Sequence, residues 1–223
     1  MIELRQVGKV YRAGPLTIPS LTDVSFRIER GEFTVLYGPS GAGKTTLLRL
    51  LYRAEVPTEG DVEVLDCSLA ELRRSEVAAL RRSIGVVFQD AKLLPGRTVY
   101  DNIAFVLRVL GTPRREVKTG VFEALRAVGM GGRAHSYPFQ LSQGEAQRAA
   151  LARAIVRKPA LLLADEPTGN LDDDMVEEVL EVIRAIWLAG TTVFFATHQA
   201  RLVERLGRRT LRLEHGRLVK DEG

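Results

Sequence analysis

The segment GPSGAGKT, residues 38–45, constrains the fold most, because it matches the pattern G-x-x-x-x-G-K-[ST] at every fixed position. A short apolar run, GEFTVLYG, leads into it, and a helical pattern, KTTLLRLLYR, follows it. A strand, a glycine-rich turn and a helix in this order let backbone N–H groups surround phosphate oxygens at the positive end of the helix. With motif and context both present, the sequence favours a phosphate-binding loop over a glycine turn that merely starts a helix.

Three further apolar runs, SIGVVFQD, ALLLADEP and TTVFFATH, each end in a polar residue and are separated by helical patterns. This arrangement predicts a parallel sheet covered on both faces. IELRQVGKVY and LTDVSFRIE alternate apolar and polar residues, which predicts half-buried antiparallel strands, and TLRLEHGRLVKDEG predicts a closing hairpin. We therefore predict an α/β fold with a mostly parallel core sheet, an antiparallel β edge and a helical lobe. The prediction is one domain over residues 1–223, with a core of 1–90 and 159–223 and a helical lobe of 91–158.

Composition limits the class of protein. The chain of 223 residues has a single cysteine, Cys67, which excludes an internal disulfide and fits a reducing compartment. No stretch reaches the roughly 18 consecutive apolar residues of a spanning helix, and the N-terminus lacks the apolar centre of a signal peptide. We expect a soluble intracellular protein. The formal charge of +4 is interpreted as a diffuse surplus on solvated helix faces. This surplus is more compatible with an acidic membrane surface than with nucleic acid, since no aromatic-basic platform accompanies it.

The phosphate loop gives chemical meaning to several polar residues. Lys44 would reach the β- and γ-phosphates, and the Thr45 hydroxyl would ligate Mg²⁺. LLLAD ends in Asp165, a carboxylate that can hold Mg²⁺, and Glu166 can orient or deprotonate an attacking water. Two adjacent acids at a strand end are usually surface residues, but beside a phosphate loop they are a second signal for phosphoryl chemistry.

Gln89 and His198 end two of the other apolar runs. Since ligands bind at the carboxyl edge of such sheets, we expect both side chains to gather there with the acids. A histidine at this edge can donate a hydrogen bond to the γ-phosphate, although a lone histidine is more often structural. His135 and His215 have no such context and receive no role.

The stretch LSQGEAQRAALARAI, residues 141–155, opens on a polar turn and continues as an alanine-rich helix. Ser142 and Glu145 form the pattern S-x-x-E, which predicts a capping box. The box does not explain Gly144, which weakens the first turn but would let an anion approach the exposed N–H groups. No lysine lies beside this helix end to hold such an anion.

LSQGEAQR resembles the signature motif of the ABC-type ATPases, and the whole chain follows that family's order of motifs. The resemblance implies that residues 38–46 are the Walker A loop, Gln89 the Q-loop, residues 161–165 Walker B, and residues 170–172 the D-loop. It also implies a catalytic glutamate at Glu166, a switch histidine at His198, catalytic roles for Gln89 and Lys44, and metal ligation by Thr45, Gln89 and Asp165. The implied contacts to ATP are Tyr11, which stacks on adenine, and Gly38, Pro39, Ser40, Gly41, Ala42, Gly43, Lys44, Thr45, Thr46, Ser142, Gln143, Gly144, Glu145, Asn170 and Asp172.

In that family two nucleotide-binding domains meet head to tail, and the signature of one closes over ATP in the phosphate loop of the other. One Walker A loop and one signature per chain therefore imply a homodimer with two composite ATP sites, which ATP closes and hydrolysis reopens. Two positions depart from the pattern. Gln143 replaces the usual first glycine of the signature, so its backbone must avoid conformations reserved for glycine. Gln199 replaces the aspartate common after the switch histidine.

Residues 93–111 follow the Q-loop, where such ATPases grip a cytoplasmic helix of a membrane partner. GRTVYDN in this segment, FQLSQGEAQRAALARAIVRKP and LLLADEPTGNLDDD most resemble the FtsE family of bacterial cell-division ATPases. That resemblance implies an FtsX-like integral membrane partner, activation of peptidoglycan hydrolases, association with division-ring proteins, and a peripheral location at the cytoplasmic face of the cell membrane.

Two alternatives remain open. The ATPases of lipoprotein-releasing and macrolide- or peptide-exporting systems share DEPTGNLD. A DNA-associated ABC-type ATPase would use the same dimer, but such proteins carry a long coiled-coil or zinc insert, and this insert is short and lacks a cysteine pair. We therefore expect no direct contact with nucleic acid.

Overall fold

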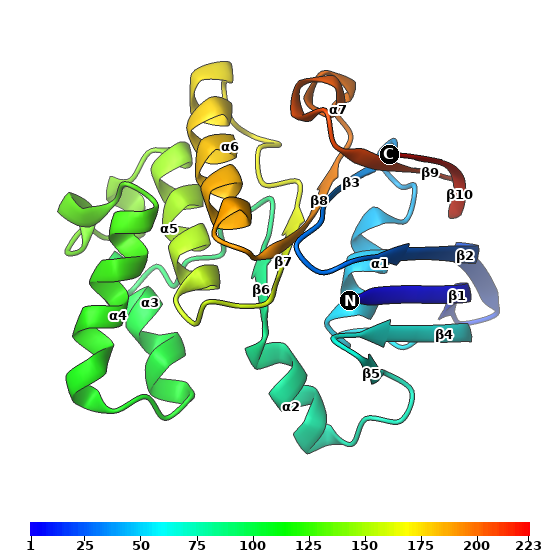
Figure 1. The fold of residues 1–223 in the computed structure, drawn as a ribbon, viewed down its shortest axis with the longest axis horizontal. Helices are drawn as coiled ribbons and strands as arrows, with labels where there is room; N and C mark the ends of the chain where they lie inside the picture. The colour runs from blue at the N-terminus through cyan, green and yellow to red at the C-terminus, as the bar shows by residue number, and fades with distance from the viewer. The chain divides into compact units, whose positions relative to one another are not determined.

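The computed structural model describes residues 1–223, with Ala13 described by its backbone alone. The chain divides into two compact units: unit 1 comprises residues 1–84 and 192–223, and unit 2 comprises residues 85–191. The predicted α/β architecture is confirmed, with mostly parallel core strands, an antiparallel β edge and a helical part (Figure 1). The predicted division into a core and a helical lobe, with boundaries at residues 90 and 159, stays a prediction.

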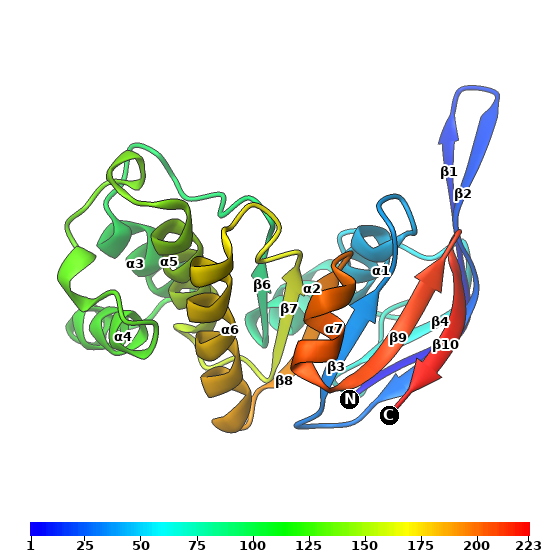
Figure 2. The same cartoon turned by 90° about the horizontal axis from the view of Figure 1, so that it is seen from above.

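An antiparallel sheet in unit 1 has the strand order β2-β1-β4-β5. Its strands are β1 (Ile2–Ala13), β2 (Leu16–Ile28), β4 (Glu59–Val64) and β5 (Cys67–Ser68). Buried and exposed residues alternate along the second half of β2, as expected for a strand with one covered face. The β1–β2 hairpin extends beyond the rest of this sheet (Figure 2), and its tip exposes Leu16 and Ile18.

The parallel strands of unit 1 centre on β3 (Phe33–Tyr37), which lies between β8 (Thr192–Thr197) and β9 (Arg209–Glu214). β10 (Arg217–Glu222) pairs antiparallel with β9 and completes the predicted hairpin. Every residue of β8 is buried, as is typical of a parallel strand covered on both faces. The helices of this unit are α1 (Lys44–Leu51), α2 (Arg74–Arg82) and α7 (Ala200–Leu206).

Unit 2 joins two parallel-sheet strands to the helical part of the chain. β7 (Leu161–Asp165) lies beside β6 (Ile84–Val87). The helices are α3 (Val99–Val109), α4 (Arg114–Ala127), α5 (Gln143–Ile155) and α6 (Asp173–Leu188), with short 3-10 turns at Gly131–Arg133 and Pro138–Gln140. α3, α4 and α5 pack against one another, and α5 also packs against α6. Among the helices the structure describes, none is long and apolar enough to cross a membrane.

Arg209 in β9 joins three parts of unit 1. Its guanidinium binds Asp221 through two hydrogen bonds of 2.8 and 2.7 Å, and it donates to the Glu32 carboxylate and the Arg27 carbonyl, both at 2.8 Å. The Arg209 hydrogen bonds hold the pKa of Asp221 below its usual value. Burial raises the pKa of Glu32, but hydrogen bonds from the Glu29 N–H, Arg209 and Thr34 outweigh it, so that pKa is also lowered.

This cluster predicts a loss of stability in acid. Because both carboxyl pKa values are lower in the folded state, their stabilisation is complete above the unfolded pKa values, and it falls as the pH drops below about 5 through the folded ones. Arg209→Met is expected to lower the free energy of unfolding by roughly 2 kcal/mol at pH 7, and to weaken its dependence on pH below 5. Urea unfolding of both proteins from neutral to acidic pH measures this. If the free energy of unfolding falls equally steeply with decreasing pH below 5 in both proteins, the role of Arg209 is contradicted.

Candidate active site

The phosphate loop connects the end of β3 at Tyr37 to the start of α1 at Lys44. Gly38 approaches the Leu213 carbonyl so closely that no side chain fits there, and Gly43 has a φ of 105°, with any Cβ only 2.6 Å from the Ser20 carbonyl oxygen. Both positions therefore require glycine. The loop turns back on itself through a 3.1 Å hydrogen bond from Ala42 N–H to the Pro39 carbonyl. The open N-terminus of α1 follows directly, as the motif predicts.

Lys44 lies against the loop rather than in solvent. Its side chain is 5% exposed, and its ammonium donates to the carbonyls of Gly38 at 2.7 Å and Pro39 at 3.0 Å. The cation thus lies against carbonyls of the same loop whose N–H groups would surround phosphates, which fits its predicted role. The adjacent Thr45 is exposed at the first turn of α1.

Thr46 has a structural contact that the sequence did not reveal, and its predicted contact to ATP stays a prediction. Its hydroxyl oxygen accepts a hydrogen bond from Ser20 at 2.9 Å and lies 3.5 Å from the Tyr11 hydroxyl. It therefore links α1 to the β1–β2 hairpin, which carries Tyr11. The Lys9 ammonium lies 4.9 Å from the centroid of the Tyr11 ring and is bound by Glu55 at 2.9 Å. Sequence reasoning missed Lys9 and Ser20, because nothing in a strand pattern marks them.

His198 follows the last residue of β8, Thr197. The Thr197 carbonyl accepts the Gly38 N–H at 3.3 Å, so the histidine comes one residue after a direct contact to the phosphate loop. Gln199 donates its backbone N–H to the Thr197 hydroxyl at 3.1 Å and precedes α7. Unit 1 therefore brings the phosphate loop and His198 together, as the predicted carboxyl edge requires.

In unit 2 the two predicted acids end β7, with Asp165 as its last residue. Glu166 has a φ of 50°, a left-handed conformation that is strained for a residue with a side chain. Strain of this kind persists where the surrounding structure enforces it, and it is common at functional sites. The Glu166 carbonyl accepts the Gly169 N–H at 3.0 Å, which closes the turn leading to the D-loop.

Gln89 contacts the D-loop within the same unit. Its amide nitrogen donates to the Asn170 side-chain oxygen at 3.3 Å. Gln89, Asn170 and Gln143 line one cleft of about 120 Å³, so the Q-loop, the D-loop and the start of the signature helix are neighbours. Asp172 caps α6 by accepting the Met175 N–H at 3.1 Å. This capping explains Asp172 structurally, and its predicted contact to ATP stays a prediction.

The predicted magnesium ligands are a hydroxyl, an amide and a carboxylate. Mg²⁺ prefers oxygen ligands and usually keeps several waters while it binds phosphates, so it needs few protein atoms. With the amide nitrogen of Gln89 turned to Asn170, its amide oxygen is the atom it can offer to a cation. No group of three or more His, Cys, Asp or Glu residues in the described part of the chain could hold a metal by itself. Thr45, Gln89 and Asp165 each carry an oxygen that suits Mg²⁺, and their joint binding of the ion stays a prediction.

The signature helix has the predicted capping box. The Ser142 hydroxyl accepts the Glu145 N–H at 3.2 Å, and the Glu145 carboxylate accepts the Ser142 N–H at 2.9 Å. That backbone hydrogen bond, together with a 2.8 Å bond from Arg133, lowers the pKa of Glu145. The carboxylate therefore stays charged and holds the helix start in place. Gln143 is the first helical residue, so the missing glycine requires no special backbone here.

Gly144 has a packing reason that the sequence did not reveal. A Cβ at this buried position would lie 3.1 Å from Cγ and Sδ of Met175 in α6. The glycine therefore permits close packing of α5 on α6, in addition to any approach of an anion. The Gln147 side chain then donates to the Phe88 carbonyl at 2.8 Å, which ties α5 to the residue before Gln89.

Comparison with known proteins identifies the family. A family model described as ABC transporter matches residues 21–169. The chain belongs to the ABC-type ATPase family. Two relatives are each 46% identical to this chain over 222 residues, which is 100% of the chain. They are the cell division ATP-binding proteins FtsE of Streptococcus pneumoniae (strain D39), of which 95% is covered, and of Mycobacterium tuberculosis (strain H37Rv), of which 96% is covered. FtsE of Escherichia coli K12 is 44% identical, covering 98% and 97%.

Solved structures agree with this assignment. The dimeric bacterial ABC transporter cassette MJ0796 matches the ATPase with a TM-score of 0.91 and 34% identity, covering 100% of this chain and 98% of that one. A dimeric post-hydrolysis state of the same cassette, bound to ADP and Pi, matches with a TM-score of 0.89 and 33% identity, again covering 100% of this chain and 98% of that one. The predicted fold, family and ATPase activity are confirmed. The roles of individual site residues stay predictions.

Proposed function

We propose that this chain is the ATP-hydrolysing subunit of an FtsE-like membrane complex that acts in bacterial cell division. The main support is the full-length similarity to cell division ATP-binding proteins FtsE of several bacteria. The motifs that would perform the reaction are all present in the chain. ATP closes pairs of subunits, and its hydrolysis lets them separate, so that a chemical cycle becomes a mechanical one.

The proposed chemistry assigns one task to each group. The loop backbone and Lys44 bind the phosphates, and Thr45, Gln89 and Asp165 hold Mg²⁺, which would neutralise phosphate charge. Glu166 orients or deprotonates the attacking water, and His198 donates a hydrogen bond to the γ-phosphate. Tyr11 stacks on adenine. The buried Lys44, held by two hydrogen bonds to the loop, and the strained backbone of Glu166 support this assignment, because such features are common at functional sites.

A second copy of the chain completes each site in this proposal. The first turn of α5 offers backbone N–H groups and the Ser142 hydroxyl, and Gln143 is exposed beside them. The chain has one phosphate loop and one signature, so two copies arranged head to tail would form two equal ATP sites, with the D-loops between them. The dimeric state of MJ0796 supports this arrangement.

The proposed partner is an FtsX-like integral membrane protein, and the segment that follows the Q-loop would contact it. Leu94 and Phe105 are 39% and 41% exposed there and offer apolar surface to a partner. Arg97 lies over the Phe105 ring at 5.0 Å and leaves part of it uncovered. Bound in this way, the ATPase would be peripheral at the cytoplasmic face of the cell membrane, near the division ring.

Capture of the partner tests the proposal. Glu166→Gln protein is incubated with ATP, Mg²⁺ and native membranes, and the recovered membrane proteins are identified by mass spectrometry. We expect a four-span FtsX-like protein, and we expect Leu94→Ser with Phe105→Ser to lose it while ATP hydrolysis persists. Recovery of a lipoprotein-releasing or drug-exporting permease would keep the ATPase chemistry and overturn the cell-division function.

A further inference from the structure

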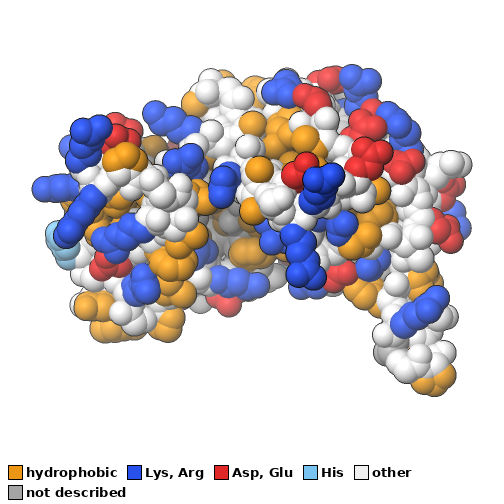
Figure 3. All heavy atoms as spheres, turned by 90° about the horizontal axis from the view of Figure 1, so that it is seen from below, with side chains coloured by type: hydrophobic (Ala, Val, Ile, Leu, Met, Phe, Trp, Pro, Cys, Tyr) orange, Lys and Arg blue, Asp and Glu red, His pale blue; other side chains and the backbone are white. Residues whose placement is uncertain are grey.

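The positive charge of the chain is concentrated in one segment. Residues 91–160 contain twelve Lys or Arg and four Asp or Glu, whereas the rest of the chain contains 20 and 24. The net surplus of the whole protein therefore comes entirely from α3, α4, α5 and their connections. Figure 3 shows Lys and Arg side chains spread between hydrophobic ones over this helical part of unit 2. This concentration differs from the diffuse surplus interpreted from the sequence.

Six exposed cations lie at or near the turn between α3 and α4, on the ends of α3 and α5 and the start of α4. The Arg157 guanidinium, just after α5, donates to the Thr112 hydroxyl at 3.3 Å and so brings the end of α5 to the α3–α4 turn. The cations, all exposed and here called the basic corner, are Arg108, Arg114, Arg115, Lys118, Arg157 and Lys158. Two of these cations have an acid partner, since Arg115 lies 3.5 Å from Glu116 and Arg108 lies 3.3 Å from Asp101 in the first turn of α3. The other four form no ion pair with any residue that the structure describes.

Helix stability alone does not explain the basic corner. Arg114 and Arg115 are the first two residues of α4. The N-terminus of a helix carries partial positive charge, so acidic residues are favoured there and cations are unfavourable. Two arginines at this position therefore weaken the helix slightly. Helix stability therefore does not account for their presence.

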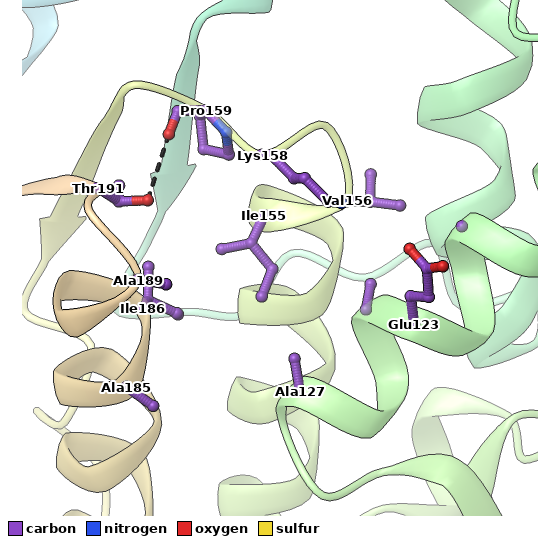
Figure 4. A pocket seen from close by; sticks show the side chains of 12 residues that line it. Glu123, Ala127, Ile155, Val156, Lys158, Pro159, Ala185, Ile186, Ala189 and Thr191 are labelled. Atoms are coloured by element: carbon purple, nitrogen blue, oxygen red, sulfur yellow. Dashed lines mark hydrogen bonds between the residues drawn. The ribbon is translucent and has the colours of Figure 1, made fainter.

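Apolar surface lies directly beside these cations. Val109, at the end of α3, is 66% exposed. Lys158 also lines a pocket of about 390 Å³, most of whose other walls are apolar (Figure 4). The remaining lining residues come from α4, from α6, from the end of α5 and from the segments after α5 and α6, and are Gly120, Glu123, Ala124, Ala127, Ile155, Val156, Pro159, Ala185, Ile186, Ala189 and Thr191. Cations next to exposed apolar groups are typical of surfaces that meet the headgroup region of a bilayer.

The basic corner is separated from the predicted catalytic residues of its unit. Lys158 precedes β7, which begins at Leu161, and Asp165 ends the same strand. A five-residue strand spans roughly 16 Å. A partner at the basic corner would therefore leave Asp165, Glu166 and Gln89 accessible.

We propose that the basic corner binds the anionic headgroups of a phospholipid bilayer. The ATPase would then contact the membrane directly, in addition to any protein partner. This inference goes beyond the proposed function, since it requires neither ATP nor an FtsX-like protein. A bilayer is favoured over nucleic acid because the cations alternate with aliphatic rather than stacked aromatic side chains.

Vesicle co-sedimentation of the full chain tests this. Vesicles of phosphatidylcholine with about one third phosphatidylglycerol are compared with pure phosphatidylcholine at about 0.1 M salt. We expect at least about tenfold tighter binding to the anionic vesicles, and a loss of at least about tenfold in Arg114→Gln with Arg115→Gln and Lys118→Gln. Glutamine has a helix propensity close to those of arginine and lysine, so α4 is expected to form in this triple variant. Unchanged ATP hydrolysis by the variant verifies that it is folded.

A matched control removes the same charge elsewhere. Arg74→Gln with Arg82→Gln and Arg217→Gln changes three exposed arginines of unit 1, and we expect less than about a threefold loss of vesicle binding. Equal losses in both triple variants, or equal binding to both kinds of vesicle, would overturn the proposal. Tighter binding to duplex DNA than to anionic vesicles, lost in the first triple variant, would overturn it in favour of a nucleic-acid surface. Arg157→Gln with Lys158→Gln provides a second test should the first variant fail to fold.

Discussion

Glu166→Gln is expected to bind ATP normally and to hydrolyse it at least about a hundredfold more slowly. Glutamine keeps the size of the side chain, but its amide cannot accept a proton from water at neutral pH. The effect is expected to fall on turnover alone, because phosphate binding depends on the loop of unit 1, whereas Glu166 follows β7 in unit 2. Release of phosphate and equilibrium binding of ATP, measured on the same preparation, separate the two steps.

The same variant also tests the composite site. If hydrolysis normally reopens the pair, a protein that binds ATP without hydrolysing it accumulates as a dimer, which light scattering detects with ATP and Mg²⁺. Glu181→Gln, an equal change of charge at an exposed position of α6, is expected to remain as active as the unmodified protein. A Glu166→Gln protein that stays monomeric when saturated with ATP contradicts the composite site. One that turns over at a near-normal rate contradicts the role of Glu166.

Much of the structure of this protein could be predicted from its sequence because it depends on interactions between residues close together in the chain. The phosphate loop was predicted because Gly38 and Gly43 occupy positions where a side chain would strike neighbouring backbone, so the residue types follow from local geometry. The strands β3, β7 and β8 were predicted because parallel strands covered on both faces are continuously apolar. The capping box of α5 was also predicted, since it joins Ser142 to a residue only three positions away.

Features that depend on distant residues were not predictable in this way. The close packing of Gly144 on Met175 joins two helices that are separate in the sequence. The bond from Gln147 to the Phe88 carbonyl likewise joins α5 to the Q-loop across a span of 59 residues. β4, with its sequence EGDVEV, was missed because only two of its residues are buried, so it has almost no apolar signal of its own. Its pairing with β1 supplies the stability that its composition lacks.

Lys44→Ala is expected to weaken ATP binding by roughly ten- to a hundredfold, the value of one hydrogen bond to a charged group. The ammonium lies 2.7 and 3.0 Å from the carbonyls of Gly38 and Pro39, so the loop already holds the cation where the phosphates would bind. Its removal also leaves those two carbonyls without this donor. Isothermal titration with ATP, tripolyphosphate and adenosine measures the loss for each part of the nucleotide.

The pattern of losses decides between two roles of Lys44. If its charge binds phosphate, the affinities for ATP and tripolyphosphate fall together while that for adenosine is kept, and Lys44→Arg recovers part of the loss. If Lys44 only supports the loop, adenosine binding also weakens, since Thr46 in the same helix contacts the Tyr11 hydroxyl. Arg49→Ala removes an exposed cation from the same helix and is expected to change none of the three affinities. Retained affinity for tripolyphosphate in Lys44→Ala would therefore refute the phosphate-binding role, whatever the fate of ATP hydrolysis.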